Sequence, residues 1–238
     1  MTIALLGYGR MGRTIDGLLA DRGHEAVLRI DETSLNQRTP ENLRTADVAI
    51  EFSVPDAAVD NILACLEAGI PVVSGTTAWL DRMDEVKQAM RATGGTLFYA
   101  PNFSIGVNLF FHINQRLAML MNDQPQYDVE IDEVHHTGKI DAPSGTAIRT
   151  AEVILGELDR TTGWSLDVKN DENDLLVRAF REPDVPGTHV VRYLSDLDEL
   201  EIRHTARSRE AFARGAIRAA EWVRGRTGYF EMSDLLGL

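Results

Sequence analysis

The sequence predicts an α/β protein that combines an N-terminal Rossmann-type parallel sheet with an α+β part holding a mostly antiparallel or mixed sheet. Two observations support the parallel sheet. Short apolar runs alternate with amphipathic stretches as far as Pro101, and a glycine-rich turn follows the first run. A third observation supports the second sheet. Beyond residue 170, strand-like runs follow one another without helices between them, as in antiparallel or mixed sheets.

In the N-terminal part, apolar runs predict buried strands, and helical spacing of apolar residues predicts the connections. The predicted strands are Thr2–Leu6, Ala26–Ile30, Ala46–Phe52, Pro71–Ser74 and Thr96–Tyr99. The predicted helices are Met11–Arg22, Asp56–Ala68 and Trp79–Ala92. Gly69 directly follows the second of these helices and is a usual C-terminal signal.

The C-terminal part has a different order of elements. The predicted helices are Val107–Met121, Ser144–Glu157 and Arg209–Gly225. The predicted strands are Tyr127–Val134, Leu175–Glu182, Thr188–Leu194 and Glu199–Ala206. The sequence pattern alone does not say which part the last helix joins.

Composition and charge exclude several classes of protein. Lys and Arg number 24 against 37 Asp and Glu, and the net charge of −13 argues against nucleic acid or an anionic membrane as a partner. We expect no membrane-spanning helix and no secretion signal. The single cysteine, Cys65, forms no internal disulfide and fits the cytoplasm. A small anionic ligand would need a local cluster of donors.

The segment Gly7-Tyr-Gly-Arg-Met-Gly12 matches the dinucleotide-binding pattern G-x-G-x-x-G between a strand and a helix. In that pattern Gly7 permits the tight turn, Gly9 lets the backbone approach a pyrophosphate, and Gly12 allows close packing of helix and strand. The N-terminus of the helix then attracts the phosphates. Asp31 ends the second predicted strand, where a carboxylate accepts a hydrogen bond from a ribose 2′-hydroxyl. These features predict dinucleotide binding.

The acidic residues at the end of the second strand also predict which dinucleotide binds. Asp31 and Glu32 would repel a 2′-phosphate, so we expect NADH to be preferred. Arg29 and Arg38 lie close by in sequence and keep NADPH as the alternative.

Gly75, Thr76 and Thr77 follow the fourth predicted strand, at the sheet edge where ligands bind in doubly wound folds. A threonine here serves equally well as the N-cap of the next helix. The pattern favours neither interpretation.

The segment Glu133–Thr146 is the richest in chemistry. His135 can donate or accept a proton near neutral pH, and Lys139 offers a point charge to a carboxylate. Gly145 and Thr146 offer N–H groups at a helix N-terminus to a second carboxylate. This is the local cluster of donors that an anionic ligand requires, although a purely structural histidine pair is the simpler alternative.

The histidines do not have the spacing of a metal site. His135 and His136 are adjacent rather than three or four residues apart, and no cysteine cluster accompanies them, so we expect no metal. The four other histidines have no polar cluster beside them in sequence and are interpreted as structural: His24, His112, His189 and His204.

Five segments together resemble one enzyme family, 4-hydroxy-tetrahydrodipicolinate reductase (dihydrodipicolinate reductase) of lysine and diaminopimelate biosynthesis. They are Gly9–Gly12, Gly75–Thr77, Ala100–Ser104, His135–Ala147 and His204–Ala216. They span nearly the whole chain, and the fourth is long and specific. One departure is Ala78, which replaces the glycine that often follows Gly-Thr-Thr in this family.

The resemblance implies roles for individual residues. His135 would be the proton donor, and Lys139 would assist protonation or bind the substrate. The implied substrate contacts are His136, Ser144, Gly145 and Thr146. The implied cofactor contacts are Gly7, Tyr8, Gly9, Arg10, Met11, Gly12, Asp31, Gly75, Thr76, Thr77, Ala100, Pro101, Asn102 and Phe103.

The resemblance also implies organisation and activity. Residues 1–104 and 210–238 would form the dinucleotide-binding domain, and residues 105–209 the domain for substrate binding and tetramerisation. The implied enzyme is a homotetrameric, NAD(P)H-dependent oxidoreductase that reduces a small cyclic dicarboxylate. Two alternatives stay open: another Rossmann-type amino- or imino-acid dehydrogenase, and a non-catalytic nucleotide sensor.

Overall fold

The computed structural model describes all residues 1–238, which divide into two compact units. Unit 1 comprises Met1–Ile105 and Glu210–Leu238, and unit 2 comprises Gly106–Arg209. The chain therefore leaves unit 1 once and returns to it for its last segment. Each unit has its own sheet and its own hydrophobic core.

Unit 1 contains a six-stranded sheet in the order β11-β5-β4-β3-β1-β2, in which every neighbouring pair is parallel. The strands are β1 (Thr2–Leu6), β2 (Glu25–Ile30), β3 (Val48–Glu51), β4 (Val72–Ser74), β5 (Thr96–Tyr99) and β11 (Gly228–Phe230). The predicted Rossmann-type parallel sheet is confirmed. β1 and β3 are neighbours at the point where the strand order reverses, and ligands bind beside the carboxyl ends of strands at such a point in open parallel sheets.

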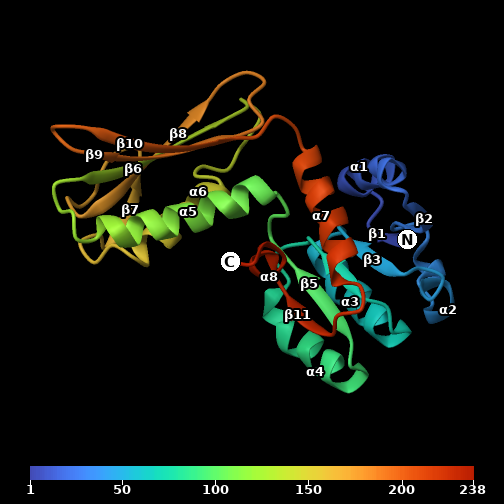
Figure 1. The fold of residues 1–238 in the computed structure, drawn as a ribbon. Helices are drawn as coiled ribbons and strands as arrows, with labels where there is room; N and C mark the ends of the chain where they lie inside the picture. The colour runs from blue at the N-terminus through green and yellow to red at the C-terminus, as the bar shows by residue number, and fades with distance from the viewer. The chain divides into compact units, whose positions relative to one another are not determined.

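Helices cover both faces of this sheet (Figure 1). One face packs on α2 (Pro40–Leu43), α3 (Pro55–Ala68) and α4 (Met83–Thr93). The other packs on α1 (Arg10–Leu19), α7 (Glu210–Val223) and α8 (Met232–Leu236). The central strands β1, β3, β4 and β5 are mostly apolar because both of their faces are buried in this way, whereas the edge strand β2 also carries exposed polar residues.

The sequence pattern missed some short elements of unit 1. β11 and α8 were not predicted, because a three-residue strand and a five-residue helix are too short to show periodicity. The helix predicted from Trp79 begins later: a 3-10 turn (Leu80–Arg82) precedes α4. Trp79 itself is buried, and its indole Nε1 donates a hydrogen bond to the carbonyl oxygen of Thr76 at 2.7 Å.

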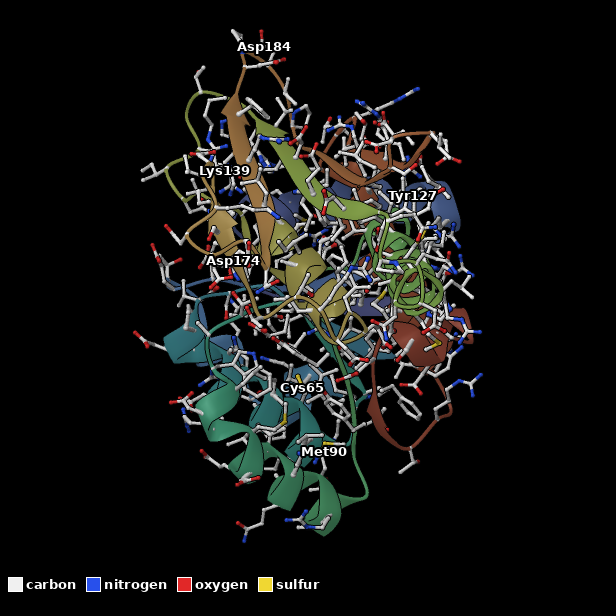
Figure 2. All side chains as sticks on the ribbon, turned by 90° about the vertical axis from the view of Figure 1, so that its left-hand side faces the viewer. Cys65, Met90, Tyr127, Lys139, Asp174 and Asp184 are labelled. Carbon is white, nitrogen blue, oxygen red and sulfur yellow. The ribbon has the colours of Figure 1, made fainter.

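Cys65 lies in the core of unit 1, on α3 (Figure 2). Burial raises the pKa of its thiol, so the residue acts as a small apolar side chain. None of the helices combines the length and apolar character that crossing a membrane requires.

Unit 2 contains a five-stranded mixed sheet in the order β10-β9-β6-β8-β7. The strands are β6 (Asp128–His135), β7 (Gly163–Leu166), β8 (Asp174–Arg181), β9 (Thr188–Leu194) and β10 (Glu199–Thr205). β9 runs antiparallel to both β10 and β6, whereas β6, β8 and β7 are parallel to one another. The predicted mixed sheet is confirmed, with β7 as an additional strand at its edge.

Two helices, α5 (Ile105–Met121) and α6 (Gly145–Leu155), lie on the same side of this sheet (Figure 1). Along β6, alternate residues from Val129 to His135 face the helices and are buried. The intervening residues, among them Glu130 and Asp132, face the other side and are half-buried. The strand thus presents Glu133 and His135 on the helix-covered face.

Gly215 on α7 marks the closest approach between that helix and the segment after β5. A Cβ atom there would lie 1.8 Å from the carbonyl oxygen of Phe103. We therefore expect Gly215→Ala to lower the free energy of unfolding by about 1–3 kcal/mol, measured by urea denaturation. Gly17→Ala on α1 is the matched control, because nothing lies within 4 Å of its Cβ position. The control should stabilise the helix slightly. Equal effects of the two substitutions would contradict this packing argument.

Candidate functional site

The glycine turn of unit 1 has the geometry that a dinucleotide phosphate requires. Gly7 has a φ of +95°, and a Cβ atom on it would lie 2.1 Å from the carbonyl oxygen of Phe52. A Cβ on Gly12 would lie 2.2 Å from the carbonyl oxygen of Gly7. Gly9, by contrast, has nothing within 4 Å of its Cβ position, and no side chain caps α1, which starts at the next residue. The turn thus leaves backbone N–H groups at a helix N-terminus open to an anion.

Side chains beside this turn form a charged cluster. The Arg29 guanidinium donates two hydrogen bonds to Asp16, at 2.7 and 2.9 Å, and thereby lowers the pKa of that carboxyl group. The Tyr8 hydroxyl donates to the same carboxylate. The Arg13 guanidinium lies 5.7 Å from the centre of the Tyr8 ring. The Arg29 guanidinium is therefore already bonded to another side chain of the protein.

Asp31 directly follows β2. Its Oδ1 accepts hydrogen bonds from the backbone N–H of Thr33 at 2.9 Å, the Thr33 hydroxyl at 2.7 Å and the Ser34 hydroxyl at 2.9 Å. These bonds lower the pKa of Asp31. Its carboxylate is consequently held in a fixed orientation. Arg38, the other nearby cation, donates to the side-chain oxygen of Asn61 at 2.7 Å.

The turn of Gly75, Thr76 and Thr77 does not cap a helix, because the next helical turn starts only at Leu80. Instead, the Gly75 N–H donates to the carbonyl oxygen of Glu51 at 2.9 Å. The hydroxyl of Thr76 donates to the Glu51 carboxylate at 3.0 Å. Ala78 adopts a φ of +60°, a region that favours glycine. Ala78, noted above as a departure from the resemblance, thus occupies a backbone conformation that glycine adopts more readily.

The segment from Ala100 to Phe103 continues the same sheet edge. The Ala100 N–H donates to the carbonyl oxygen of Ser74 at 3.2 Å. Phe103 is only 1% exposed, and its ring packs against Phe52 and Phe98 with centroid separations of 5.6 and 5.8 Å. The ring thus belongs to the core and is not open to a ligand.

In unit 2, His135 is the last residue of β6 and is 8% exposed. Its Nδ1 atom lies 3.6 Å from Oε2 of Glu133, too far for a hydrogen bond, and has no hydrogen-bond partner. Burial lowers the pKa of His135, and the nearby Glu133 carboxylate partly opposes that shift. The imidazole thus lies next to a fixed negative group, a position suited to taking up and releasing a proton.

Glu133 is fully buried on the same face of the strand, two residues before His135. Its Oε2 accepts from the backbone N–H of Ser144 at 3.0 Å, and its Oε1 accepts from Arg181 Nη1 at 3.3 Å. These two donors fix the carboxylate beside the imidazole. The sequence interpretation gave Glu133 no role, although its spacing from His135 puts both side chains on one face of a strand.

The sequence analysis interpreted His189 as structural because no polar cluster lies beside it in sequence, but in the fold it lies next to Glu133 and His135. β9 pairs with β6 so that His189 lies opposite Glu133, and its Nε2 is 3.8 Å from the Glu133 carboxylate. Its ring centre lies 5.1 Å from that of His135. Burial, followed by the charge of His135, lowers the pKa of His189 to about 3. Only the strand register brings these residues together, and no local sequence pattern reports that register.

The remaining predicted residues lie in the loop after β6 and at the start of α6. Lys139, labelled in Figure 2, lies in this loop. Its ammonium group donates to both carboxylate oxygens of Asp141, at 2.8 and 2.7 Å. Ser144 caps α6 by accepting from the Ala147 N–H at 3.2 Å, and its hydroxyl is also 3.2 Å from Nε2 of His189. Gly145 and Thr146 are the first residues of α6. His136 follows β6 directly.

Glu133, His135 and His189 each offer a ligand atom within 4.8 Å of the others, a donor set that zinc accepts. Ser144 N–H and Arg181 already occupy the two oxygens of Glu133, however. A metal would have to compete with both donors and with the guanidinium charge. The arrangement favours proton handling over metal binding.

Comparisons with known proteins cover the whole chain. The family model "Dihydrodipicolinate reductase, N-terminus" matches residues 1–103, and "Dihydrodipicolinate reductase, C-terminus" matches residues 106–236. A 4-hydroxy-tetrahydrodipicolinate reductase from Christiangramia forsetii is 48% identical, with 99% of this chain and 98% of the relative aligned. The reductase of the same name from Neisseria meningitidis is 35% identical, with 100% and 98% aligned.

One solved structure is a dipicolinate-bound dihydrodipicolinate reductase from a Paenisporosarcina species. It superposes with a TM-score of 0.81 at 21% identity, and 97% of each chain is covered. This likeness shows that the two chains share the fold.

Proposed function

The chain belongs to the dihydrodipicolinate reductase family, and we propose that it reduces 4-hydroxy-tetrahydrodipicolinate with NAD(P)H to tetrahydrodipicolinate in lysine and diaminopimelate biosynthesis. The overall reaction consumes one hydride and one proton and releases water. The full-length identity of 48% to a reductase of that name supports the substrate. The observation that carries the chemistry is His135, buried beside Glu133 and close to the first turn of α6. The test is whether the protein oxidises NADH or NADPH only when this substrate is present.

His135 is the proposed proton donor. The nicotinamide, when bound, supplies the hydride to the substrate ring. A proton from His135 then neutralises the negative charge that develops on the conjugated ring. The Glu133 carboxylate, 3.6 Å from Nδ1, stabilises the charged imidazole while that proton is held. Arg181 and the Ser144 N–H keep the carboxylate in place.

The proposed substrate contacts are donors around the start of α6. Gly145 and Thr146 present N–H groups of the first helical turn to one carboxylate. Lys139 and His136 bind the other, and Ser144 adds a hydroxyl. In this proposal Lys139 leaves Asp141 when the substrate binds, because a substrate carboxylate offers the ammonium group an equivalent partner.

The proposed nucleotide contacts are the glycine turn (7–12), Asp31, the turn of residues 75–77 and the backbone of residues 100–103. NADH is the proposed preferred nucleotide, with NADPH as the alternative. The hydrogen bonds of Asp31 support this preference, because they fix a carboxylate at the strand end where a ribose 2′-hydroxyl binds in folds of this kind. Arg29 and Arg38 are bonded to Asp16 and Asn61, so a 2′-phosphate would have to replace these partners to bind either cation.

Asp31→Ser tests the proposed nucleotide preference. We expect it to lower the ratio of kcat/KM for NADH to that for NADPH about tenfold or more, because it removes a charge-assisted hydrogen bond and a repulsion. The measurement is initial rates with each nucleotide at low ionic strength. Glu32→Gln is the matched control and should change the ratio less. A wild-type protein that prefers NADPH, or an unchanged ratio in Asp31→Ser, would contradict the proposal.

We further propose a homotetramer in the cytoplasm, assembled through the face of the five-stranded sheet that lies opposite α5 and α6. That face carries half-buried ion pairs, among them Arg178 with Asp132 at 3.1 Å and Arg192 with Glu201 at 3.0 Å. A strand face without helices and with matched charges suits a self-complementary interface. Sedimentation velocity should give the mass of four chains, and a monomer at assay concentration would contradict the assembly.

The proposed location in the cytoplasm has separate support, because the single buried cysteine agrees with a reducing compartment.

A further inference from the structure

Glu51 is a buried carboxylate that the proposed mechanism does not use. It is the last residue of β3 and is 0% exposed. Oε1 accepts from the Ser53 N–H at 3.0 Å, from the Thr76 hydroxyl at 3.0 Å and from the Ser53 hydroxyl. Oε2 accepts from the Ser74 hydroxyl at 2.7 Å. All of these donors are neutral, so this carboxylate is held by hydrogen bonds alone.

The donors come from the segments that line the ligand-binding edge of the sheet. Ser74 ends the neighbouring strand β4, and Thr76 belongs to the turn that follows it. The Gly75 N–H adds a backbone bond to the carbonyl oxygen of Glu51 at 2.9 Å. Both the main chain and the side chain of Glu51 therefore hold the turn of residues 75–77, which is not part of a helix or strand.

Phe52, the next residue, contacts two further segments of the proposed nucleotide site. Its carbonyl oxygen lies 2.1 Å from where a Cβ on Gly7 would be. Its ring lies 2.2 Å from the Cβ position of Gly75 and packs on Phe103 at 5.6 Å. The end of β3 thus touches the glycine turn, the turn of residues 75–77 and the segment after β5. A change in any one of these contacts would shift a neighbouring segment.

A hydrogen-bond chain extends from Glu51 toward the segment that follows β2. The Ser53 hydroxyl, bonded to Glu51, accepts from the side-chain amide of Asn61 at 3.1 Å. The Asn61 oxygen accepts from Arg38 at 2.7 Å. These hydrogen bonds therefore join the turn of residues 75–77 to Arg38. Apart from Arg29, which Asp16 holds, Arg38 is the cation nearest in sequence to Asp31, the residue proposed to select the nucleotide.

We infer that Glu51 is a positioning residue for the nicotinamide nucleotide, which orders the turn of residues 75–77 for binding through its hydrogen bonds to Thr76 and Gly75. This inference rests on the proposed function. In physical terms, a turn outside regular structure samples several conformations unless its polar groups are fixed, and ordering it in advance removes that entropy cost from binding. Glu51 acts through the turn and touches neither substrate nor reacting atoms.

Three variants separate positioning from general stability. Glu51→Ala removes the side-chain bond from the Thr76 hydroxyl and keeps the main-chain bond from the Gly75 N–H. Glu51→Gln keeps a carbonyl oxygen for the Ser53 and Thr76 donors and turns its amide toward Ser74, whose hydroxyl can accept instead. Ser74→Ala is the matched control, since it removes the bond to Oε2, which comes from a strand and not from the turn. The dissociation constant for NADH is measured by calorimetric titration, and the stability of each variant by thermal unfolding.

We expect Glu51→Ala to weaken NADH binding about tenfold, with faster amide exchange at residues 75–77 in the nucleotide-free protein. Glu51→Gln should remain within about threefold of the wild type. Ser74→Ala should lower Tm while its dissociation constant stays near that of the wild type. If Glu51→Ala does not fold, Thr76→Val compared with Thr76→Ser provides the same exchange test, with fast exchange expected only in the valine variant.

Wild-type affinity in a folded Glu51→Ala protein would overturn the inference, as would equal losses in Glu51→Ala and Ser74→Ala. Unchanged exchange in both Glu51→Ala and Thr76→Val would overturn it too. A loss in Glu51→Gln as large as that in Glu51→Ala would assign the effect to charge and not to the hydrogen bonds. A wild-type protein that binds neither NADH nor NADPH would instead refute the proposed function, so the two failures are distinguishable.

Discussion

His135→Gln lowers kcat by about 10²–10⁴-fold and leaves KM for the dicarboxylate nearly unchanged, if the imidazole is the proton donor. Glutamine fills a similar volume and can occupy the buried position beside Glu133. It has no proton of suitable acidity to transfer, so the loss falls on the chemical step. Steady-state kinetics with saturating nucleotide measure both constants.

The pH dependence provides a second readout for the same group. Burial holds the pKa of His135 below the ordinary histidine value of about 6.5. A proton donor must be protonated, so wild-type kcat/KM decreases as the pH rises through that pKa. His135→Gln loses this decrease. His112→Gln on α5 is the matched control and should keep both rate and pH profile. A near-normal kcat in His135→Gln would show that the proton comes from elsewhere.

Lys139→Ala has the second largest expected effect. The ammonium group offers a charge-assisted hydrogen bond to a substrate carboxylate, and losing it should lower kcat/KM about 10–100-fold. We expect both constants to change, with a higher KM and a lower kcat, because the same contact also orients the ring. Initial rates over a range of substrate concentrations measure the two effects separately.

Two controls show whether this effect is local. Lys169→Ala removes the same charge from another loop of unit 2, where Lys169 bonds the carbonyl oxygen of Glu172, and should leave the kinetics unchanged. Asp141→Asn weakens the ion pair that holds Lys139 in the structure and should change KM only slightly. Equal kinetic losses in Lys139→Ala and Lys169→Ala would contradict a direct contact with substrate.

Local patterns predicted much of this fold. The glycine turn of residues 7–12 and the apolar runs of the central strands carry their structure in short segments, because turn geometry and burial act within a few residues. The alternation along β6 likewise places His135 on a buried face. β11 could not be predicted in this way: it has three residues, and its only strand partner, β5, lies far away in the sequence.

The residues of the candidate site likewise differ in whether a local sequence pattern predicts them. His135 and Lys139 belong to one contiguous segment and could be predicted from it as candidate site residues. His189 could not, since it reaches Glu133 only through the pairing of β9 with β6. Glu51 was missed for a related reason. A single acidic residue at the end of an apolar strand has no local signature, and its donors Ser74 and Thr76 come from the neighbouring strand and its turn.

The most direct test of the proposed reductase activity is a coupled assay with purified protein. A synthase generates the unstable substrate in situ from pyruvate and aspartate semialdehyde, and oxidation of NADH and of NADPH is followed separately by absorbance. We predict oxidation that requires the synthase, is faster with NADH, and is nearly abolished in His135→Gln. A folded wild-type protein that oxidises neither nucleotide under these conditions would contradict the proposal, and would favour a different dehydrogenase or a nucleotide sensor.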